Sequence, residues 1–374
     1  MAVGMDEIVV RRRWLTREEY LDLMAAVNLI PGPNSTEVMI HTGYMMKGIP
    51  GAILAGACFI IPSLIITIAL TALVVAGGSL TAVESIFWGL KPVIVAIIAV
   101  AGVRLIPGAL KTRALIMLAV TAVIALVVLN LPEIVVILGS GVVFALIQVI
   151  LRGGLGGAAL LIGGAFQAAS LNVSRYAEPI AQAAAALSVP SALDLFWYFL
   201  RIGSILFGTG YVLFAYVQQD LVETYRWLTQ QQLLDAIAIG QFTPGPVFTA
   251  AGSMGYMTAG LPGALAGAFG IFLPSFVFVI LSAPFIPRMR QSRVLSAFLD
   301  GLNAAVVAAI GVVVVELAGA ALLPYSGGFE AGLPISVIGV SLIAVSLVAL
   351  LRFKINATWM LIIGGVVGLI VGMT

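Results

Sequence analysis

The chain has 374 residues, of which 61% are hydrophobic and only 9% charged, and its mean hydropathy is +1.17. A soluble domain carries roughly 45–50% apolar and about 25% charged residues, so this composition excludes a water-soluble domain. The 18 Lys and Arg residues nearly balance the 16 Asp and Glu residues, which argues against a nucleic-acid partner. A single cysteine (Cys58) and a single histidine (His41) exclude an internal disulfide and a multi-ligand thiolate or imidazole metal site. We therefore expect an all-α, polytopic integral membrane protein with no metal and no cofactor.

Long apolar runs follow one another along the chain, separated by short turns and small basic clusters. A membrane helix needs about 20 mostly apolar residues, and the runs that meet or approach this length are 50–76, 82–105, 113–130, 132–151, 193–217, 261–285, 294–322, 333–351 and 355–373. The run 155–171 is shorter and is followed by polar sequence, so we interpret it as a weak or partial span. Together the runs predict about 9–11 transmembrane helices. They are too long for the strands of an outer-membrane barrel.

The sequence repeats itself. WLTREEYLDLMAAVNLIPGP at 14–33 matches WLTQQQLLDAIAIGQFTPGP at 227–246, an offset of 213 residues with 9 identities in 20. At an offset of 212, residues 44–63 match residues 256–275 with 8 identities in 20. Two homologous halves are typical of secondary transporters. The expected parts are a first repeat (1–152), a connector with the weak span (153–191) and a second repeat (192–374).

Positive charges indicate that the two halves have opposite orientations in the membrane. The basic loop of the first half is 104–113, and its counterpart in the second half contains Glu316 and no cation. The basic loop of the second half is 288–293, and its counterpart, 76–81, contains no cation. Because Lys and Arg mark the cytoplasmic side, equivalent loops face opposite sides. We therefore expect inverted halves in the cell (inner) membrane.

The halves differ at their beginnings. The second half has an apolar helix, FWYFLRIGSILFGTGYVLFAYV, ahead of its WLT sequence, whereas the first half has only MAVGMDEIVVRRR. Either the first half has lost this helix, or the assigned start of the chain lies about 20 residues too late. We favour the late start, because a half without this helix would expose packing surface to lipid.

Each half contains a Pro-Gly-Pro sequence flanked by hydroxyl-bearing residues. Two prolines around a glycine cannot continue a helix, so each unit predicts a broken helix or re-entrant hairpin. Such backbone is tolerated at membrane depth only inside the protein or along a water-filled cavity, and the amides that open the next helix can bind an anion. A structural kink between packed helices is the alternative. The expected substrate-binding residues of these units are Pro31, Gly32, Pro33, Asn34, Ser35, Thr36, Thr243, Pro244, Gly245, Pro246 and Thr249.

Two cations fall inside expected spans. A lipid-facing Lys91 or Arg201 would cost at least about 2.5–3.5 kcal/mol on insertion scales, so both are expected to face the protein interior. There each could neutralise a bound oxyanion, which adds both residues to the candidate binding site. The alternative is an internal salt bridge, with Glu84 as one candidate partner for Lys91.

Acidic residues in or near the spans are candidates for proton coupling, because a buried carboxyl group can carry a proton. The candidates are Glu37, Asp300 and Glu316. For Glu37 the alternative is a first-turn residue that balances the helix dipole. The equivalent residues Asp22 and Asp235 are expected on the surface of amphipathic helices.

The motifs NLIPGPNSTE in the first half and GQFTPGPVFTAAGSMGY, GIFLPSF and FLDGLN in the second resemble those of the chromate transporter family, long two-domain type. The resemblance covers nearly the whole chain, except that the leading helix of the family is absent from the first half. It implies export of chromate from the cytoplasm, driven by the proton gradient, with sulfate as a related oxyanion. The expected partners are the oxyanion, protons and the lipid bilayer, and a homodimer with a second copy of the chain is a further expectation.

Other functions remain open to different degrees. A membrane-embedded enzyme is disfavoured because the chain has one His, one Cys, no closely spaced pair of carboxylates and no nucleotide motif. A passive channel for inorganic anions, or a transporter of a different oxyanion, is the main alternative. The sequence predicts alternating access of the two inverted halves around the Pro-Gly-Pro units.

Overall fold

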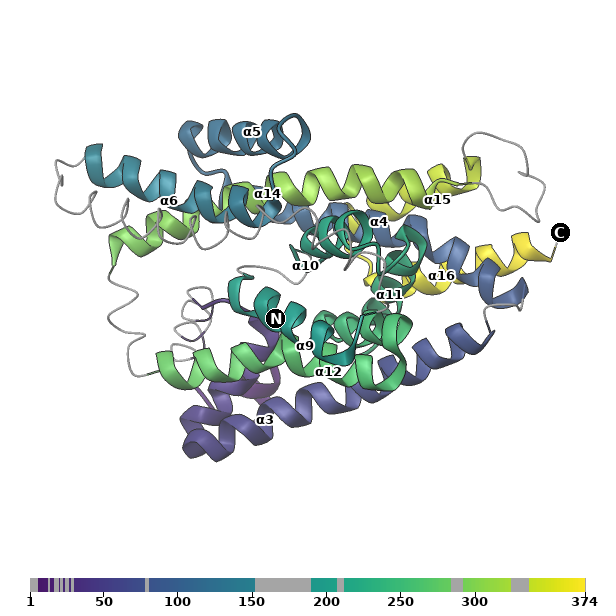
Figure 1. Ribbon diagram of the computed structural model, residues 1–374, viewed down its shortest axis with the longest axis horizontal. Coiled ribbons are helices and arrows are strands. Elements are labelled where there is room, and N and C mark those ends of the chain that lie inside the picture. The colour runs from purple at the N-terminus through teal and green to yellow at the C-terminus, as the bar shows by residue number, and fades with distance from the viewer. Residues whose placement is uncertain are drawn as a thin grey trace.

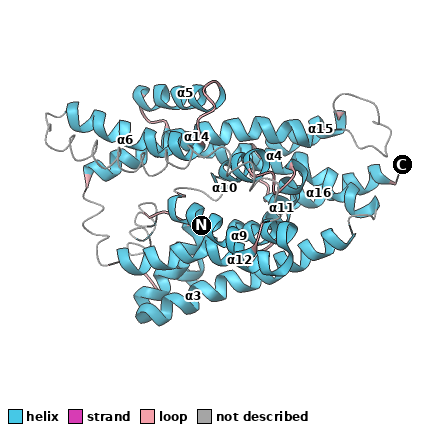
Figure 2. Ribbon diagram, viewed as in Figure 1, coloured by secondary structure: helices cyan, strands magenta, loops and turns pink. Residues whose placement is uncertain are grey.

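The computed structural model describes residues 6–12, 14–16, 20, 23, 27, 30–77, 81–151, 190–206, 212–283, 292–323 and 336–373. Within these ranges the chain forms helices and loops and no strand (Figure 2). The helices are η1 (Asp6–Arg11), α3 (Asn34–Gly77), α4 (Thr81–Ala109), α5 (Arg113–Val127), α6 (Glu133–Leu151), α9 (Ala192–Ile205), α10 (Val212–Val217), η2 (Gln218–Thr224), α11 (Gln230–Phe242), η3 (Val247–Thr249), α12 (Ala250–Ser282), α14 (Arg293–Ala321), α15 (Val337–Leu351) and α16 (Ala357–Gly372). The weak span expected at 155–171 lies outside the described residues.

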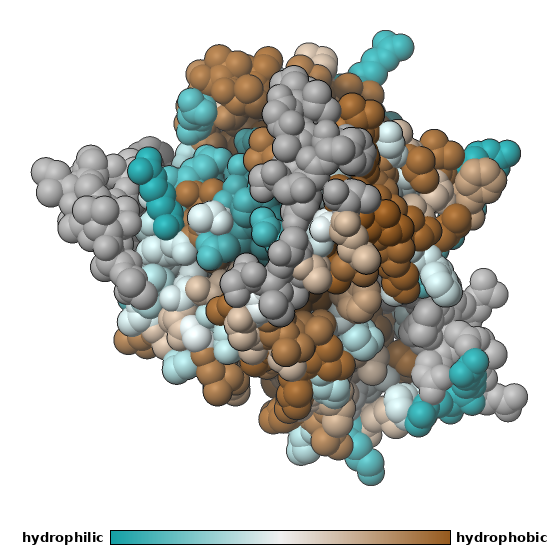
Figure 3. Space-filling model, turned by 90° about the vertical axis from the view of Figure 1, so that its right-hand side faces the viewer, coloured by the Kyte–Doolittle hydropathy of each residue, from teal (hydrophilic) through white to brown (hydrophobic). Residues whose placement is uncertain are grey.

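The helices have the length and surface of membrane spans. Five of the described helical segments are long and apolar enough to cross a bilayer, and three shorter apolar helices accompany them. Large apolar side chains such as Leu54, Met117 and Val315 are 66–73% exposed, and Figure 3 shows broad hydrophobic areas on the face that it presents. Lipid is the solvent that suits such a surface. The expectation of an all-α, polytopic membrane protein is confirmed.

The long helices α3 and α12 each double back as a helical hairpin. In α3 the helix is interrupted at Lys47 and Gly48, where Gly48 has a φ of 61°. A Cβ atom added to Gly43 or Gly51 would overlap the carbonyl oxygen of the other, although eight residues of a straight helix span about 12 Å. The chain therefore reverses between a short arm (34–46) and a long arm (49–77).

The same reversal recurs in α12. The interruption falls at Ala259 and Gly260, where Gly260 has a φ of 64°. Gly255 and Gly263 approach each other as closely as Gly43 and Gly51 do in α3. The short arm of α12 is 250–258 and its long arm is 261–282, so the repeated sequences have matching backbones.

The two hairpins lie side by side in the lower layer of Figure 1, where α3 and α12 are in contact. In that view the long arm of α3 runs from the purple end toward the right, and the long arm of α12 runs the opposite way. The upper layer contains α4, α6, α14, α15 and α16, with α5 above it. Glycines permit close helix contacts there: Gly89 of α4 against Gly364 of α16, and Gly301 of α14 against Phe144 of α6.

One expected span is interrupted. The apolar run 193–217 predicts one helix, but α9 ends at Ile205 and Leu206 has an extended backbone, with φ −83° and ψ 108°. The following sequence, FGTGY, contains two glycines, which disfavour helix. α9 begins with a capping box formed by Ser191 and Asp194. The interruption places the end of α9 beside the first Pro-Gly-Pro.

Candidate functional site

The first helix break, Pro31–Pro33, is buried between the two halves. Gly32 has a φ of 140°, a conformation that favours glycine, and its N–H donates to the Leu206 carbonyl at the end of α9, with N···O 2.7 Å. A Cβ on Gly32 would lie 2.5 Å from Oε1 of Glu37 and 2.6 Å from Oγ of Ser275. The break therefore brings together the start of α3, the end of α9 and the long arm of α12.

Three polar side chains at the first break are fully buried: Thr36, Glu37 and Ser275 are each 0% exposed. Within the described part of the chain, both carboxyl oxygens of Glu37 and the hydroxyl oxygens of Thr36 and Ser275 have no hydrogen-bond partner. Ser35, by contrast, is exposed. Of the hydroxyl residues expected to bind substrate here, only Thr36 faces inward.

The second helix break, Pro244–Pro246, follows α11 and precedes η3 and α12. Gly245 has a φ of 147° and, unlike Gly32, is exposed, as is Pro244. A Cβ on Gly245 would lie 2.5 Å from Cβ of Ser63 on the long arm of α3. The second break is thus accessible where the first is closed.

A row of hydroxyl groups surrounds the second break. Ser63, Thr67 and Thr71 follow one another at one-turn intervals on the long arm of α3, and each is 0% exposed. Their hydroxyl oxygens lie 3.4 Å from Oγ1 of Thr249, 3.3 Å from Oγ1 of Thr243 and 2.8 Å from Oγ of Ser253, respectively. These pairs join residues more than 170 positions apart and hold the two halves together at the break.

The two halves exchange serines at the breaks, which was not predicted from the sequence. Ser63 lies against the glycine of the second break, and its repeat equivalent, Ser275, lies against the glycine of the first. The sequence does show that the two serines are equivalent, because the aligned segments 44–63 and 256–275 both end in Pro-Ser, at Pro62-Ser63 and Pro274-Ser275. The role of each serine depends on which half it contacts, and only the tertiary structure shows these contacts.

Lys91 lies away from both breaks. Its Nζ is 3.3 Å from Oδ1 of Asp235 and also hydrogen-bonds Oε1 of Gln231, both on α11. The partner is therefore Asp235 rather than the Glu84 considered from the sequence. The expectation that Asp235 is a surface residue is also wrong, since its side chain is only 18% exposed. This ion pair between α4 and α11 neutralises the charge of Lys91 within the protein.

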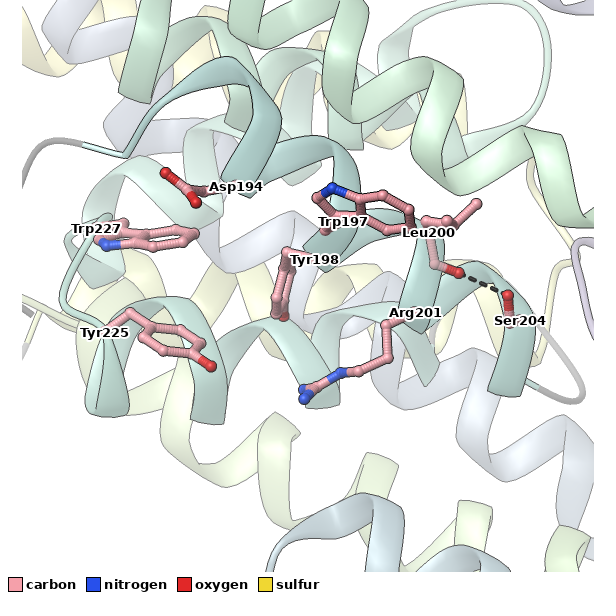
Figure 4. Close-up of a pocket in the computed structure, with 8 residues that line it drawn as sticks. All are labelled: Asp194, Trp197, Tyr198, Leu200, Arg201, Ser204, Tyr225 and Trp227. Atoms are coloured by element: carbon pink, nitrogen blue, oxygen red, sulfur yellow. Dashed lines mark hydrogen bonds between the residues drawn. The ribbon is translucent and has the colours of Figure 1, made fainter. Parts of the chain in front are cut away.

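Arg201 lies in a cleft of about 480 Å³ on α9 (Figure 4). Its guanidinium is 2.9 Å from Oδ2 of Asp220 and lies over the ring of Tyr198, with 5.9 Å to the ring centroid. The rings of Tyr225 and Trp227 stack at a centroid separation of 4.8 Å. Asp220 neutralises Arg201, so neither of the two span cations is a free counter-charge for an anion at the breaks. The cleft residues are Asp194, Trp197, Tyr198, Leu200, Arg201, Ser204, Tyr225 and Trp227.

The other two acidic candidates lie in different surroundings from Glu37. Asp300 pairs with Lys111, Oδ1 to Nζ 3.0 Å, at a partly exposed site. Glu316 is half-buried on α14, within electrostatic range of Glu133 and Glu223. Among the three candidates, only Glu37 is at a helix break, fully buried and without a partner among the described residues.

Comparisons with known proteins agree with the membrane architecture. The family model described as "Chromate transporter" matches residues 1–145 and 193–369. Similar proteins include the "Chromate transport protein" of Cupriavidus metallidurans, 30% identical over 83% of this chain and 76% of that protein. The "Chromate transport protein" of Pseudomonas aeruginosa is 31% identical over 83% of this chain and 74% of that protein. The "Probable chromate transport protein" of Synechococcus elongatus is 27% identical over 83% of this chain and 77% of that protein.

No solved structure gives a significant match to the chain. The family match nevertheless covers both repeats, including both helix breaks and the long arms of α3 and α12. This chain is a multi-pass membrane protein that belongs to the chromate transporter family.

Proposed function

We propose that this chain is a secondary transporter that exports chromate from the cytoplasm, accepts sulfate as a related oxyanion and is coupled to the proton gradient. The observation that carries the proposal is the pair of helix breaks at the contact between α3 and α12, each completed by a serine from the opposite half. Broken helices near the midplane, at the interface of two repeats, are where secondary transporters bind substrate. The names of the similar proteins supply the oxyanion.

Chromate and sulfate are both tetrahedral dianions, so they require several hydrogen-bond donors rather than one shape-specific contact. Hydroxyl groups can donate to such a ligand because the O–H bond rotates to suit its partner. The helix that follows each break adds its opening amides and the positive end of its dipole. This chemistry supports binding of a divalent oxyanion but does not discriminate sharply between chromate and sulfate.

Alternating access of inverted halves is part of the proposal. The backbones of the two halves match at the breaks and reversals, and the long arms of α3 and α12 run in opposite directions (Figure 1). Lys111 from the basic loop of the first half and Arg293 from that of the second line one cleft. This proximity supports a shared cytoplasmic side for both basic loops, as inverted halves require.

Counterflow in proteoliposomes tests the function. Labelled chromate or sulfate should exchange against unlabelled anion, and an imposed pH gradient should drive accumulation. Uptake that follows voltage alone, without exchange, would instead establish a passive anion channel.

The breaks themselves are tested by the double substitution Pro31→Ala with Pro244→Ala. Restoring two amide donors and relaxing φ allows helix to extend into each break, so exchange should be lost while folded yield is kept. Pro107→Ala, at an exposed position in α4, is the matched control and should exchange normally. Exchange by the double variant at the wild-type rate would overturn the assignment of the breaks.

A further inference from the structure

The two helix breaks have the same backbone, but among the described residues only the first has an ionisable group. At the first break the fourth residue after Pro33 is Glu37, fully buried and pointing its Oε1 toward Gly32. At the second break the equivalent residue is Ala250, which is also 0% exposed. The sequence difference at this one aligned position gives the first break an acidic group and leaves the second without one.

Glu37 lacks the partners that would stabilise an ionised carboxylate. Neither carboxyl oxygen has a hydrogen-bond partner within the described ranges, and Glu37 forms no ion pair there. Burying an unpaired charge costs far more than burying a neutral acid, so the group holds a proton in this state. It becomes ionised only when the break opens to water or to a partner.

The elements around Glu37 supply no compensating cation among the described residues. Its own arm carries His41 one turn later, which is buried with its ring edge-on to Tyr44. α12 contributes the hydroxyl of Ser275, and α9 contributes the Leu206 carbonyl, which already accepts from Gly32. The described N-terminal segment adds Tyr20, which packs in the same apolar cluster as Val38.

A dianion is disfavoured at the first break and favoured at the second. Two negative charges next to a carboxylate repel it whenever Glu37 is ionised. At the second break the described polar side chains are hydroxyl groups from both halves, with no carboxylate among them, and Gly245 itself is exposed. The two breaks can therefore hold ligands of opposite charge at one interface between the halves.

Building on the proposed transport function, we infer that the two breaks bind different ligands, one the oxyanion and the other the coupling proton. The second break binds the oxyanion through the hydroxyl groups of Ser63, Thr67, Thr243, Thr249 and Ser253. The first break carries the coupling proton on Glu37, and the hydroxyl of Ser275 lies at the same glycine, Gly32. Both ligands then lie against the same pair of hairpins, so movement of α3 past α12 changes the access of both.

The exchanged serines provide a matched test, because Ser63→Ala and Ser275→Ala make the same chemical change at equivalent positions. The measurements are the Kd of radiolabelled sulfate for the purified protein and sulfate counterflow in proteoliposomes with and without a pH gradient. Removing a hydrogen bond to a charged ligand weakens binding about tenfold to hundredfold. Ser63→Ala should raise the Kd by that factor, whereas Ser275→Ala should alter the response to the pH gradient and not the Kd.

Glu37→Gln tests the proton site directly. It keeps the size of the side chain and removes the ionisable group, so exchange of sulfate should continue while accumulation driven by a pH gradient is lost. Equal loss of sulfate affinity in the Ser63→Ala and Ser275→Ala variants would overturn the division of roles, as would gradient-driven accumulation by Glu37→Gln. The serine variants carry the test even if Glu37→Gln does not fold.

The two proposals fail differently. A wild-type protein that neither binds nor exchanges sulfate or chromate overturns the proposed function and, with it, the assignment of the breaks. If the wild-type protein exchanges both anions, but the sulfate Kd is raised by Ser275→Ala at the first break rather than by Ser63→Ala at the second, only the division of roles is overturned.

Discussion

The two hairpins, α3 and α12, show how far a repeated backbone can diverge in its chemistry. Gly32 and Gly245 have φ values of 140° and 147°, and Gly48 and Gly260 have φ values of 61° and 64°. Yet the first break is closed and carries Glu37, whereas the second is accessible and surrounded by hydroxyl groups. Proline and glycine maintain the shape of a break, while the side chains beside it determine which ligand it suits.

The outer faces of the two hairpins differ as well. α9 packs on the long arm of α12, where a Cβ on Gly270 would lie 2.6 Å from the Phe196 carbonyl oxygen. The equivalent residue on α3, Cys58, is exposed. The same fold element is therefore covered by a helix in one half and presents an uncovered apolar face, among the described residues, in the other.

Alanine at the glycine of each break should have the largest effect. Gly32→Ala places a Cβ 2.5 Å from Oε1 of Glu37, and Gly245→Ala places one 2.5 Å from Cβ of Ser63, in both cases with a φ that L-residues rarely adopt. Backbone strain of this kind costs about 1–3 kcal/mol, and the clash adds to it. Counterflow should fall to background in both variants, with the greater loss of thermal stability in Gly32→Ala because its site is buried.

Gly311→Ala is the control for these two variants, because a Cβ there meets nothing within 4 Å. It should transport normally and unfold at the wild-type temperature or slightly above. Normal transport by Gly32→Ala or Gly245→Ala would show that the break geometry is dispensable and would remove the basis of the comparison.

Transferring a carboxyl group to the second break should have the next largest effect. Ala250→Glu adds at the oxyanion site an ionisable carboxyl group like that of Glu37 at the first break, whereas Ala250→Gln adds nearly the same volume without an ionisable group. The Kd for sulfate should be at least roughly tenfold higher in the Glu variant than in the Gln variant, equivalent to about 1.4 kcal/mol. Indistinguishable affinities would mean that the charge at this position does not distinguish the breaks.

Removing the cation of α4 should affect stability more than anion binding. Lys91→Met leaves Asp235 unpaired at a site where both side chains are less than 20% exposed, and we expect a loss of about 3 kcal/mol in the free energy of unfolding. The double variant Lys91→Met with Asp235→Leu should recover most of it. Thermal unfolding in detergent measures this effect. A raised sulfate Kd with unchanged stability would place Lys91 at the substrate instead.

The smallest effect is expected from Asp300→Asn. The pair of Asp300 with Lys111 has side chains 29% and 55% exposed, and exposed ion pairs contribute about 0–1 kcal/mol. Accumulation of sulfate driven by a pH gradient should remain, in contrast to the Glu37→Gln variant. If Asp300→Asn loses the response to the gradient, the coupling proton does not reside at the first break.

Much of the architecture could be predicted from the sequence, because it depends on local rules. Apolar runs of the length of a bilayer predict helices, and the repeated Pro-Gly-Pro identifies where helices cannot continue. The hairpin reversals at Gly48 and Gly260 were not predicted, although both glycines belong to the aligned repeat. The interruption after Ile205 was also missed, since hydropathy alone does not distinguish a continuous helix from a divided one.

What the sequence by itself determined was the membrane class, the duplication and the two breaks. Tertiary structure alone decided which side chains meet there: Ser63 at the second break, Ser275 at the first, and Asp235 beside Lys91. The physical reason is the distance along the chain over which each kind of residue acts. Proline and glycine act on their own backbone, whereas the environment of a carboxyl or hydroxyl group depends on helices 140 or more residues away in the chain.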